Sequence, residues 1–308
     1  MKCKMRRIEP RFLRSDGKPN FSDKIYEREF ELSVIVKKPV ITASQRAPVK
    51  EVIQMMVSHG FRRVPITMPD MRLLGIVTAT DLVNYFGGGD YFNIIVNRHE
   101  GNLYKAVEEP IESIMVRNVV KAYIDETFVD VLERMVVNNV GAVPIVDEDE
   151  KVFGIITERD VLRYLANKVT GKKVKDIMTK DVVTASPETT VKEASQTMIN
   201  LGFRRLPVIV DDKLVGIVVA MDIVKLFQLK RAIQLSPKCS IYDLIRIPIS
   251  NIMSSPVITI SPDAELGEAT KIMSERRIGA LPVVENNELV GILTERDMVY
   301  DLVLAEYR

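Results

Sequence analysis

Four aspartates occupy the same place in four related stretches of the chain: Asp81, Asp160, Asp222 and Asp297. An ionised aspartate only accepts hydrogen bonds, so one carboxylate can take both hydroxyls of a ribose. Each aspartate is expected where a strand turns into a helix, and the unpaired N–H groups and dipole of a helix N-terminus favour a nearby phosphate. We therefore predict that the four aspartates bind ribose.

The residue three positions before each aspartate adds a hydroxyl donor in three of the four stretches. It is Thr78, Thr157 or Thr294, whereas the third stretch has Val219. We predict that the threonines contact phosphate and that the third stretch lacks this contact. A single T-x-x-D pattern is more commonly a plain helix cap, so that interpretation stays open.

Arginines distinguish the stretches from one another. The first and third carry Arg62–Arg63 and Arg204–Arg205 shortly before a proline, where the second and fourth have Gly-Ala. The second and fourth instead carry Arg159 and Arg296 directly before the aspartate. A guanidinium presents a planar fork that suits phosphate oxygens. We predict that these arginines contact phosphate; the alternative is a solvated arginine on an exposed strand.

Three spacings place the aspartates in a repeating unit. A proline lies 23 residues after the first position of each unit, a glycine 9 or 10 residues after the proline, and the aspartate 6 residues after the glycine. The first positions are Thr42, Lys121, Thr184 and Thr259, and the prolines are Pro65, Pro144, Pro207 and Pro282. Spacings that hold in four copies indicate a true internal repeat.

The third unit shows the elements that must position these residues. The β-branched run 182–184 predicts a short strand, and the capping box from Thr190 to Glu193 predicts a helix that ends at Gly202. Two apolar runs on either side of 211–213 predict a strand pair with a tight turn. A last helix begins near Asp222, which we place at its N-cap.

The copies alternate in type, since the first resembles the third and the second resembles the fourth. One unit of this size buries only a marginal core, so pairing is expected. We predict an N-terminal extension (1–30) and two modules, 31–168 with repeats at 31–86 and 111–168, and 171–304 with repeats at 171–228 and 248–304.

Composition excludes several classes of protein. The 308 residues include 43 basic and 42 acidic side chains, a net charge of +1, which gives no reason to expect nucleic acid or anionic membrane as a partner. Two cysteines and two histidines are too few for a disulfide framework or a typical zinc site. No uncharged run is long enough to span a bilayer, and the basic start has no apolar core of a secretory signal, so we predict a cytoplasmic protein.

The strand–helix–strand–strand–helix unit with its G-h-h-T-x-x-D pattern resembles the CBS domain, named for cystathionine β-synthase. Two such units resemble a Bateman module, and four in one chain are similar to the nucleotide-sensing γ subunit of AMP-activated protein kinase. The resemblance covers roughly 31–304. It implies an α/β (α+β) fold with two CBS pairs packed into a disc, adenosine ligands in clefts between repeats, and no catalytic activity.

In this family adenine lies near the first strand of a repeat. The resemblance therefore implies adenine contacts at Ile41, Thr42 and Ala43, at Val183, Thr184 and Ala185, and at Ile258, Thr259 and Ile260. Lys121 replaces the threonine in the second copy, which weakens that site or adds charge to it. The basic slot before the proline is a phosphate contact in the family, which makes Arg63 and Arg205 the first candidates.

These observations predict a regulatory protein without catalytic residues or a required cofactor. Its ligand would be an adenine nucleotide (AMP, ADP or ATP), and occupancy would be transmitted to a protein partner whose identity the sequence does not reveal. No membrane partner is expected, nucleic acid is not favoured, and a homodimer stays open. Two alternatives stay open as well: an adaptor with empty clefts, and a protein that binds S-adenosylmethionine, whose cationic sulfonium would disfavour a cleft with converging arginines.

Overall fold

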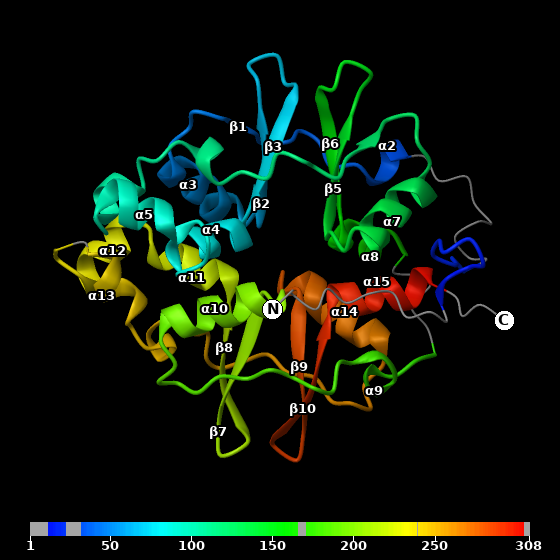
Figure 1. The fold of residues 1–308 in the computed structure, drawn as a ribbon. Coiled ribbons are helices and arrows are strands. Elements are labelled where there is room, and N and C mark those ends of the chain that lie inside the picture. The colour runs from blue at the N-terminus through cyan, green and yellow to red at the C-terminus, as the bar shows by residue number, and fades with distance from the viewer. Residues whose placement is uncertain (1–11, 23–31, 166–170, 239, 305–308) are drawn as a thin grey trace. The chain divides into compact units, whose positions relative to one another are not determined.

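The computed structural model describes residues 12–22, 32–165, 171–238 and 240–304. Helices alternate with antiparallel strand pairs along the chain, which is the mixed α/β arrangement that the repeating unit predicts (Figure 1). Among the described residues, no helix is long and apolar enough to cross a membrane.

The chain divides into two compact units. The first contains Ile41–Val119 and Val183–Val257, and the second contains Val120–Val182, Ile258–Arg308 and Met5–Val40, as far as these are described. The first unit therefore holds repeats one and three, and the second holds repeats two and four. The predicted modules 31–168 and 171–304 join consecutive repeats instead, and they stay a prediction.

Repeat one contains all of the elements expected of the unit. β1 (Ala43–Ser44) runs parallel to β2 (Arg63–Thr67), which pairs with β3 (Leu73–Thr78) in antiparallel register. α3 (Val49–His59) connects β1 to β2, and α4 (Ala79–Phe86) follows β3 directly. The connector after α4 forms α5 (Phe92–His99), α6 (Leu103–Ala106) and the short 3₁₀ helix η2 (Ile111–Ser113).

A buried glutamate ties this connector together. Glu109 is 5% exposed and accepts hydrogen bonds from Arg98 Nη1 at 2.8 Å and from Ser113 Oγ at 2.6 Å. His99 Nε2 lies 2.7 Å from its other oxygen. Burial alone would raise the pKa of Glu109, but the hydrogen bonds from Ser113 and His99 hold this pKa below its ordinary value. His99 therefore has a structural contact in the described chain.

Repeat three confirms the local signals in its sequence. α10 (Val191–Leu201) begins with the capping box between Thr190 and Glu193 and ends at the left-handed Gly202. β7 (Arg205–Val210) and β8 (Lys213–Val219) enclose a two-residue turn with positive φ. The predicted first strand is reduced to a single parallel bridge between Ala185 and Val208. The remaining elements are α11 (Ala220–Leu226), α12 (Leu229–Leu235), α13 (Ile241–Ile245) and η4 (Ile249–Asn251).

The second unit repeats the same plan. Its elements from repeat two are β4 (Ala122–Tyr123), α7 (Phe128–Val137), β5 (Ala142–Val146), β6 (Val152–Thr157) and α8 (Glu158–Leu165). Those from repeat four are α14 (Leu266–Glu275), β9 (Ala280–Glu285), β10 (Glu288–Thr294) and α15 (Glu295–Val303), and the leading segments add α2 (Leu32–Ile35) and α9 (Val174–Ile177).

Part of the N-terminal extension packs on this second unit. Phe21 is 4% exposed and lies in the same hydrophobic cluster as α15. The Ser22 N–H donates to the carbonyl oxygen of Val303 at 2.9 Å. Residues 1–11 and 23–30 of the predicted extension lie outside the described residues.

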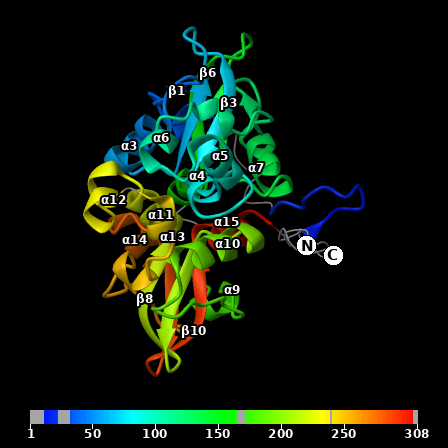
Figure 2. The same cartoon turned by 60° about the vertical axis from the view of Figure 1, so that its left-hand side comes forward.

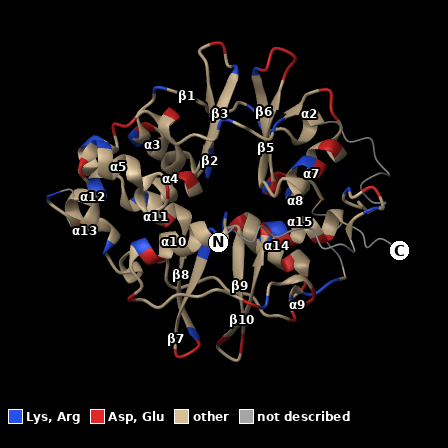
Figure 3. Cartoon of the chain, viewed as in Figure 1, with Lys and Arg blue, Asp and Glu red and all other residues tan. Residues whose placement is uncertain are grey.

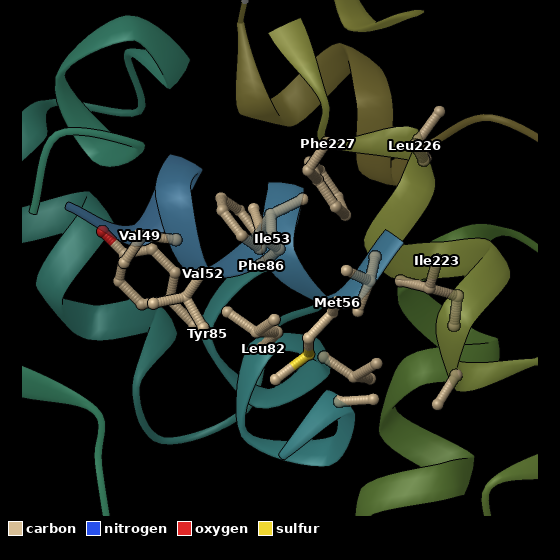
Figure 4. Close-up of a cluster of buried hydrophobic side chains, with 14 of the residues drawn as sticks. Val49, Val52, Ile53, Met56, Leu82, Tyr85, Phe86, Ile223, Leu226 and Phe227 are labelled. Carbon is tan, nitrogen blue, oxygen red and sulfur yellow. The ribbon is translucent and has the colours of Figure 1, made fainter. Parts of the chain in front are cut away.

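The core of the first unit lies between helices of its two repeats. Apolar side chains at helical spacing on α3 and α4 form one cluster with Ile223 of α11 and with Phe227 directly after that helix (Figure 4). The rings of Phe86 and Phe227 stack with centroids 4.4 Å apart. α4 and α11 lie side by side in both views (Figures 1 and 2). Each fully buried phenylalanine contributes about 1.5–3 kcal/mol through the hydrophobic effect.

The glycine of each repeat makes room for the segment that leads into a neighbouring repeat. A Cβ on Gly75 would lie 2.8 Å from Sδ of Met115, and one on Gly216 would lie 2.4 Å from Sδ of Met253. Each of these methionines lies six residues before the first position of its own repeat. The segment that leads into repeat two therefore covers repeat one, and the segment that leads into repeat four covers repeat three. The other two pairs are Val36 over Gly154 and Met178 over Gly291.

Candidate functional site

The predicted ribose aspartates all lie in the first turn of a helix that follows a strand. In repeat one, the N–H and Oγ1 of Thr78 both donate to Oδ2 of Asp81 at 2.7 Å, and the Asp81 N–H donates back to Thr78 Oγ1 at 3.4 Å. This is a capping box in which the threonine is the N-cap and the aspartate is the third residue of the helix. The prediction that the aspartate of repeat three is the N-cap is wrong, because Val219 takes that position and donates only its N–H to Asp222, at 3.0 Å.

In the capping boxes, the threonine hydroxyls already donate hydrogen bonds to the aspartates. The hydroxyl donates its only hydrogen to Oδ2 of the aspartate, at 2.7 Å from Thr78, 2.5 Å from Thr157 and 2.7 Å from Thr294. A threonine side chain has one donor hydrogen, so a hydrogen bond to phosphate would require the hydroxyl to rotate away from the aspartate. The phosphate role of these threonines stays a prediction.

The aspartates differ from ordinary caps in their burial. Asp160, Asp222 and Asp297 are 5%, 8% and 9% exposed. Burial raises the pKa of Asp81 despite the hydrogen bonds from Thr78. It also raises the pKa of Asp222, against the Val219 N–H and Lys225. An ionised carboxylate that has lost its water gains from a ligand hydroxyl that donates to it.

The capping carboxylate of α10 provides the contrast. Glu193 accepts hydrogen bonds from Thr190 in the same geometry, but it lies at the surface, and these hydrogen bonds lower the pKa of its carboxyl. Capping alone therefore favours the ionised form, and it is burial that opposes ionisation at Asp81 and Asp222.

The strand register brings the arginine pairs to the same helix starts. Arg63 lies opposite Thr78 in the β2–β3 pair, and Arg205 lies opposite Val219 in the β7–β8 pair. All four arginines of these pairs are partly buried. The carbonyl oxygens of Arg62 and Arg204 accept hydrogen bonds from the first residue of α4 and α11, both at 2.9 Å. Each arginine pair therefore lies beside the T-x-x-D or V-x-x-D segment of its own repeat.

Arg159 and Arg296 already have acidic partners. Arg296 Nε donates to Glu158 Oε1, and Arg159 Nε donates to Glu295 Oε1, both at 2.6 Å. Burial alone would lower the pKa of Arg296, but the charge of Glu158 and its hydrogen bond raise this pKa above its ordinary value. The predicted phosphate contacts of the two arginines stay a prediction, and such contacts would have to compete with the glutamates.

Glu158 and Glu295 were not predicted as site residues. Their side chains are 8% and 6% exposed, and they link α8 to α15 in two reciprocal ion pairs. The corresponding positions in the first unit are Ala79 and Ala220, so that unit has no such pairs there. The T-E-R-D sequence recurs in repeats two and four, and the glutamate and arginine of one copy pair with the arginine and glutamate of the other copy.

The residues predicted near adenine differ in environment: Ile258 and Thr259 are exposed, whereas Ile41, Thr42 and Val183 are partly buried. Ala43 and Ile260 are each 5% exposed and belong to the hydrophobic clusters. Thr184 and Ala185 instead line a surface pocket of about 460 Å³ together with Glu193 and other residues of repeat three. A larger pocket of about 640 Å³ lies between α3 and α12, away from every predicted residue.

Repeat two also differs at its first position. Lys121 forms an ion pair with Glu150, whose other oxygen accepts a hydrogen bond from the Tyr123 hydroxyl at 2.5 Å. Glu150 belongs to the acidic turn between β5 and β6, which is red in Figure 3. The added charge that the sequence predicts at Lys121 is thus balanced by this turn.

Comparison with known proteins finds one family along the chain. The CBS-domain model matches residues 32–88, 111–167, 174–229 and 249–303. The uncharacterized protein MJ1225 of Methanocaldococcus jannaschii is 32% identical over 271 residues, which are 87% of this chain and 97% of that protein. Its crystal structure matches with a TM-score of 0.84 over 88% of this chain and 99% of that one, and it is described as a proposed archaeal homolog of g-AMPK. An uncharacterized 33.4 kDa protein from the ribosomal RNA operon of Thermofilum pendens is 33% identical over 88% of this chain and 91% of that protein.

Proposed function

This chain belongs to the CBS-domain family, and we propose that it is a non-catalytic regulatory protein that binds adenine nucleotides and transmits their occupancy to a protein partner. The ligand is an adenosine phosphate whose ribose hydroxyls donate to the four aspartates. The phosphates are bound by the arginine pairs of repeats one and three and by the N–H groups at the helix starts.

The arrangement of the aspartate carboxylates carries the proposal. In each repeat, donors at the helix start hold Oδ2, so a ligand would meet a carboxylate whose orientation is already set. Orientation in advance reduces the entropy lost on binding. A structural cap does not need burial, as the exposed capping residue Asp130 of α7 illustrates. Burial of three of the four aspartates therefore favours a ligand role over a capping role alone.

The relatives support the same class of function. MJ1225, which matches this chain over nearly the whole length of MJ1225, is described as a proposed archaeal homolog of g-AMPK. A regulatory subunit acts through the difference in ligand affinity between two states, and its response cannot exceed that difference. We propose a protein as the partner that senses this difference, and the net charge of +1 provides no general attraction to nucleic acid.

Titration calorimetry with adenosine, AMP, ADP, ATP and S-adenosylmethionine tests the proposal. Asp160→Asn and Asp297→Asn keep an oxygen that can accept the capping hydrogen bonds but lose the charge, and each should weaken nucleotide binding at its own repeat about ten- to a hundredfold. Asp130→Asn changes a capping aspartate on the first helix of repeat two and should leave binding unchanged. Absence of heat with every ligand would favour an adaptor without a ligand.

The phosphate role needs a separate variant. Arg63→Ala should weaken ATP and ADP more than adenosine, because Arg63 lies opposite Thr78 at the helix start. Equal losses for all three ligands would show that this side chain does not contact phosphate. Tighter binding of S-adenosylmethionine than of any nucleotide would contradict the ligand class itself.

A further inference from the structure

One backbone position in each repeat, five residues before the aspartate, pairs with a residue from another part of the chain. The isoleucine five residues before each aspartate forms a bridge with a residue of a leading segment. The bridges pair Ile76 with Val116, Ile155 with Lys37, Ile217 with Ser254, and Ile292 with Thr179. Three of the four incoming residues are neutral, and Lys37, which pairs with repeat two, is the charged one.

Lys37 contacts Oδ1 of Asp160, the carboxylate oxygen that does not take part in the helix cap. Oδ2 accepts hydrogen bonds from the N–H and hydroxyl of Thr157, at 3.1 and 2.5 Å. The Lys37 ammonium lies 3.0 Å from Oδ1, and Arg163 Nη1 lies 4.0 Å from the same atom. The Asp160 side chain is 4% exposed, while that of Lys37 is 52% exposed.

The contact balances charge without forming a hydrogen bond. Oδ1 of Asp160 is buried and accepts no hydrogen bond from the described residues. A buried carboxylate oxygen without a donor is costly, so this atom has unused capacity for a hydroxyl. The ammonium is positioned over that same atom, and its long flexible stem allows it to move away.

We propose that Lys37 is a specificity residue of repeat two that competes with ribose for Asp160 and thereby selects phosphate-bearing ligands. This inference rests on the proposed function. A ribose hydroxyl that donates to Oδ1 displaces the ammonium from the carboxylate that it contacts among the described residues. Neutral adenosine offers the ammonium nothing in return, whereas a nucleotide offers its phosphates. Repeats one, three and four carry the uncharged residues Val116, Ser254 and Thr179 at this position. In repeat three, Lys225 lies 3.7 Å from Oδ1 of Asp222, but it belongs to the helix of that aspartate and not to a leading segment.

The ion pair is tested first without ligand. Lys37→Met removes the charge and keeps most of the stem, and it should lower the melting temperature of the full chain. The same substitution in an Asp160→Asn background should have little effect, because the charge that it would balance is gone. Lys38→Met is the matched control, since the Lys38 ammonium lies over the ring of Phe153 instead. Equal losses from Lys37→Met in both backgrounds would overturn the inference.

Selectivity is tested by calorimetry with Asp160 as the single remaining ribose aspartate, in the full chain with Asp81→Asn, Asp222→Asn and Asp297→Asn. Lys37→Met should strengthen adenosine binding about tenfold and ATP binding less, so that the dissociation constant of adenosine falls relative to that of ATP. An unchanged ratio, or weaker adenosine binding, overturns the inference and leaves the proposed function intact. Loss of all binding in this background, while the wild type still binds adenine nucleotides, also overturns the inference and leaves the proposed function intact. Failure of the wild type to bind any adenine compound overturns the proposed function, and the inference with it.

Discussion

Replacing Arg296 by methionine tests the interpretation that the arginines of the second unit are held by glutamates. Arg296→Met removes the guanidinium that pairs with Glu158, whose side chain is 8% exposed. Removal of one partner of a fully buried pair costs about 3–5 kcal/mol. The Arg296 side chain is 19% exposed, so water screens part of the interaction, and we expect a loss near the lower end, about 3 kcal/mol. This corresponds to a decrease in melting temperature of roughly 6–12 °C for a unit of this size.

The double variant makes the prediction specific. Glu158→Gln in the Arg296→Met background removes the buried charge, so it should recover more than half of the lost stability. The first unit has Ala79 and Met221 at these two positions, which shows that the fold accepts an uncharged pair. Differential scanning calorimetry of the wild type, both single variants and the double variant gives the coupling energy. Arg163→Met on the exposed side of α8 is the control, with an expected loss below about 1 kcal/mol.

Two results would refute this reasoning. If the double variant loses as much as the sum of the single variants, Glu158 and Arg296 are not coupled. If Arg296→Met leaves the ligand-free stability unchanged and weakens nucleotide binding, the guanidinium contacts the ligand rather than Glu158.

Other variants are expected to change stability in a defined direction. Asp81→Asn should raise the melting temperature at neutral pH: burial raises the pKa of Asp81 above its ordinary value of 3.8, so the ionised carboxyl costs stability above that value and not below it. A scan at acid pH should show no gain, and a loss at both pH values would contradict the argument. Glu109→Gln should cost about 1–3 kcal/mol. Hydrogen bonds outweigh burial and hold the pKa of Glu109 below its ordinary value, so the wild type loses this stability as the pH falls through the pKa of Glu109 in the folded protein. Calorimetry should therefore show that the difference in stability between the wild type and Glu109→Gln decreases on acidification. Gly216→Ala should cost about 1–3 kcal/mol and be largely rescued by Met253→Ala, since the three heavy atoms nearest to its new Cβ all belong to the flexible Met253 side chain. Gly75→Ala should resist rescue by the equivalent change at Met115, because its Cβ would also lie 2.9 Å from a backbone oxygen; equal rescue of both would contradict the packing argument.

Local signals in the sequence predict the elements of the repeat well. The capping box at Thr190, the helix end at Gly202 and the tight turn after β7 are all present as expected. Each depends on residues within a few positions of one another, so backbone preferences and neighbouring side chains decide them. The N-cap assignment of Asp222 failed for a related reason: the carboxylate reaches back by three residues, and the sequence pattern alone does not distinguish the two positions.

The long-range partners of the site residues could not be predicted in this way. Arg159 and Arg296 contact glutamates that are 136 and 138 residues away in the chain. The T-E-R-D pattern contains both partners, but nothing in it indicates that α8 lies against α15. The same holds for Lys37, which looks like one of many surface lysines until the leading segment is placed beside β6.

The amino-acid sequence by itself determined the fourfold repeat, the order of strands and helices within it, and the aspartates and arginines that mark each copy. Tertiary structure decided which carboxylate oxygen does not take part in the helix cap, which arginines already pair with an acid, and which aspartate contacts a lysine from a distant segment. The physical reason is the range of the interactions. Caps and turns are formed by near neighbours, whereas burial and charge pairing arise only when distant segments pack together and exclude water.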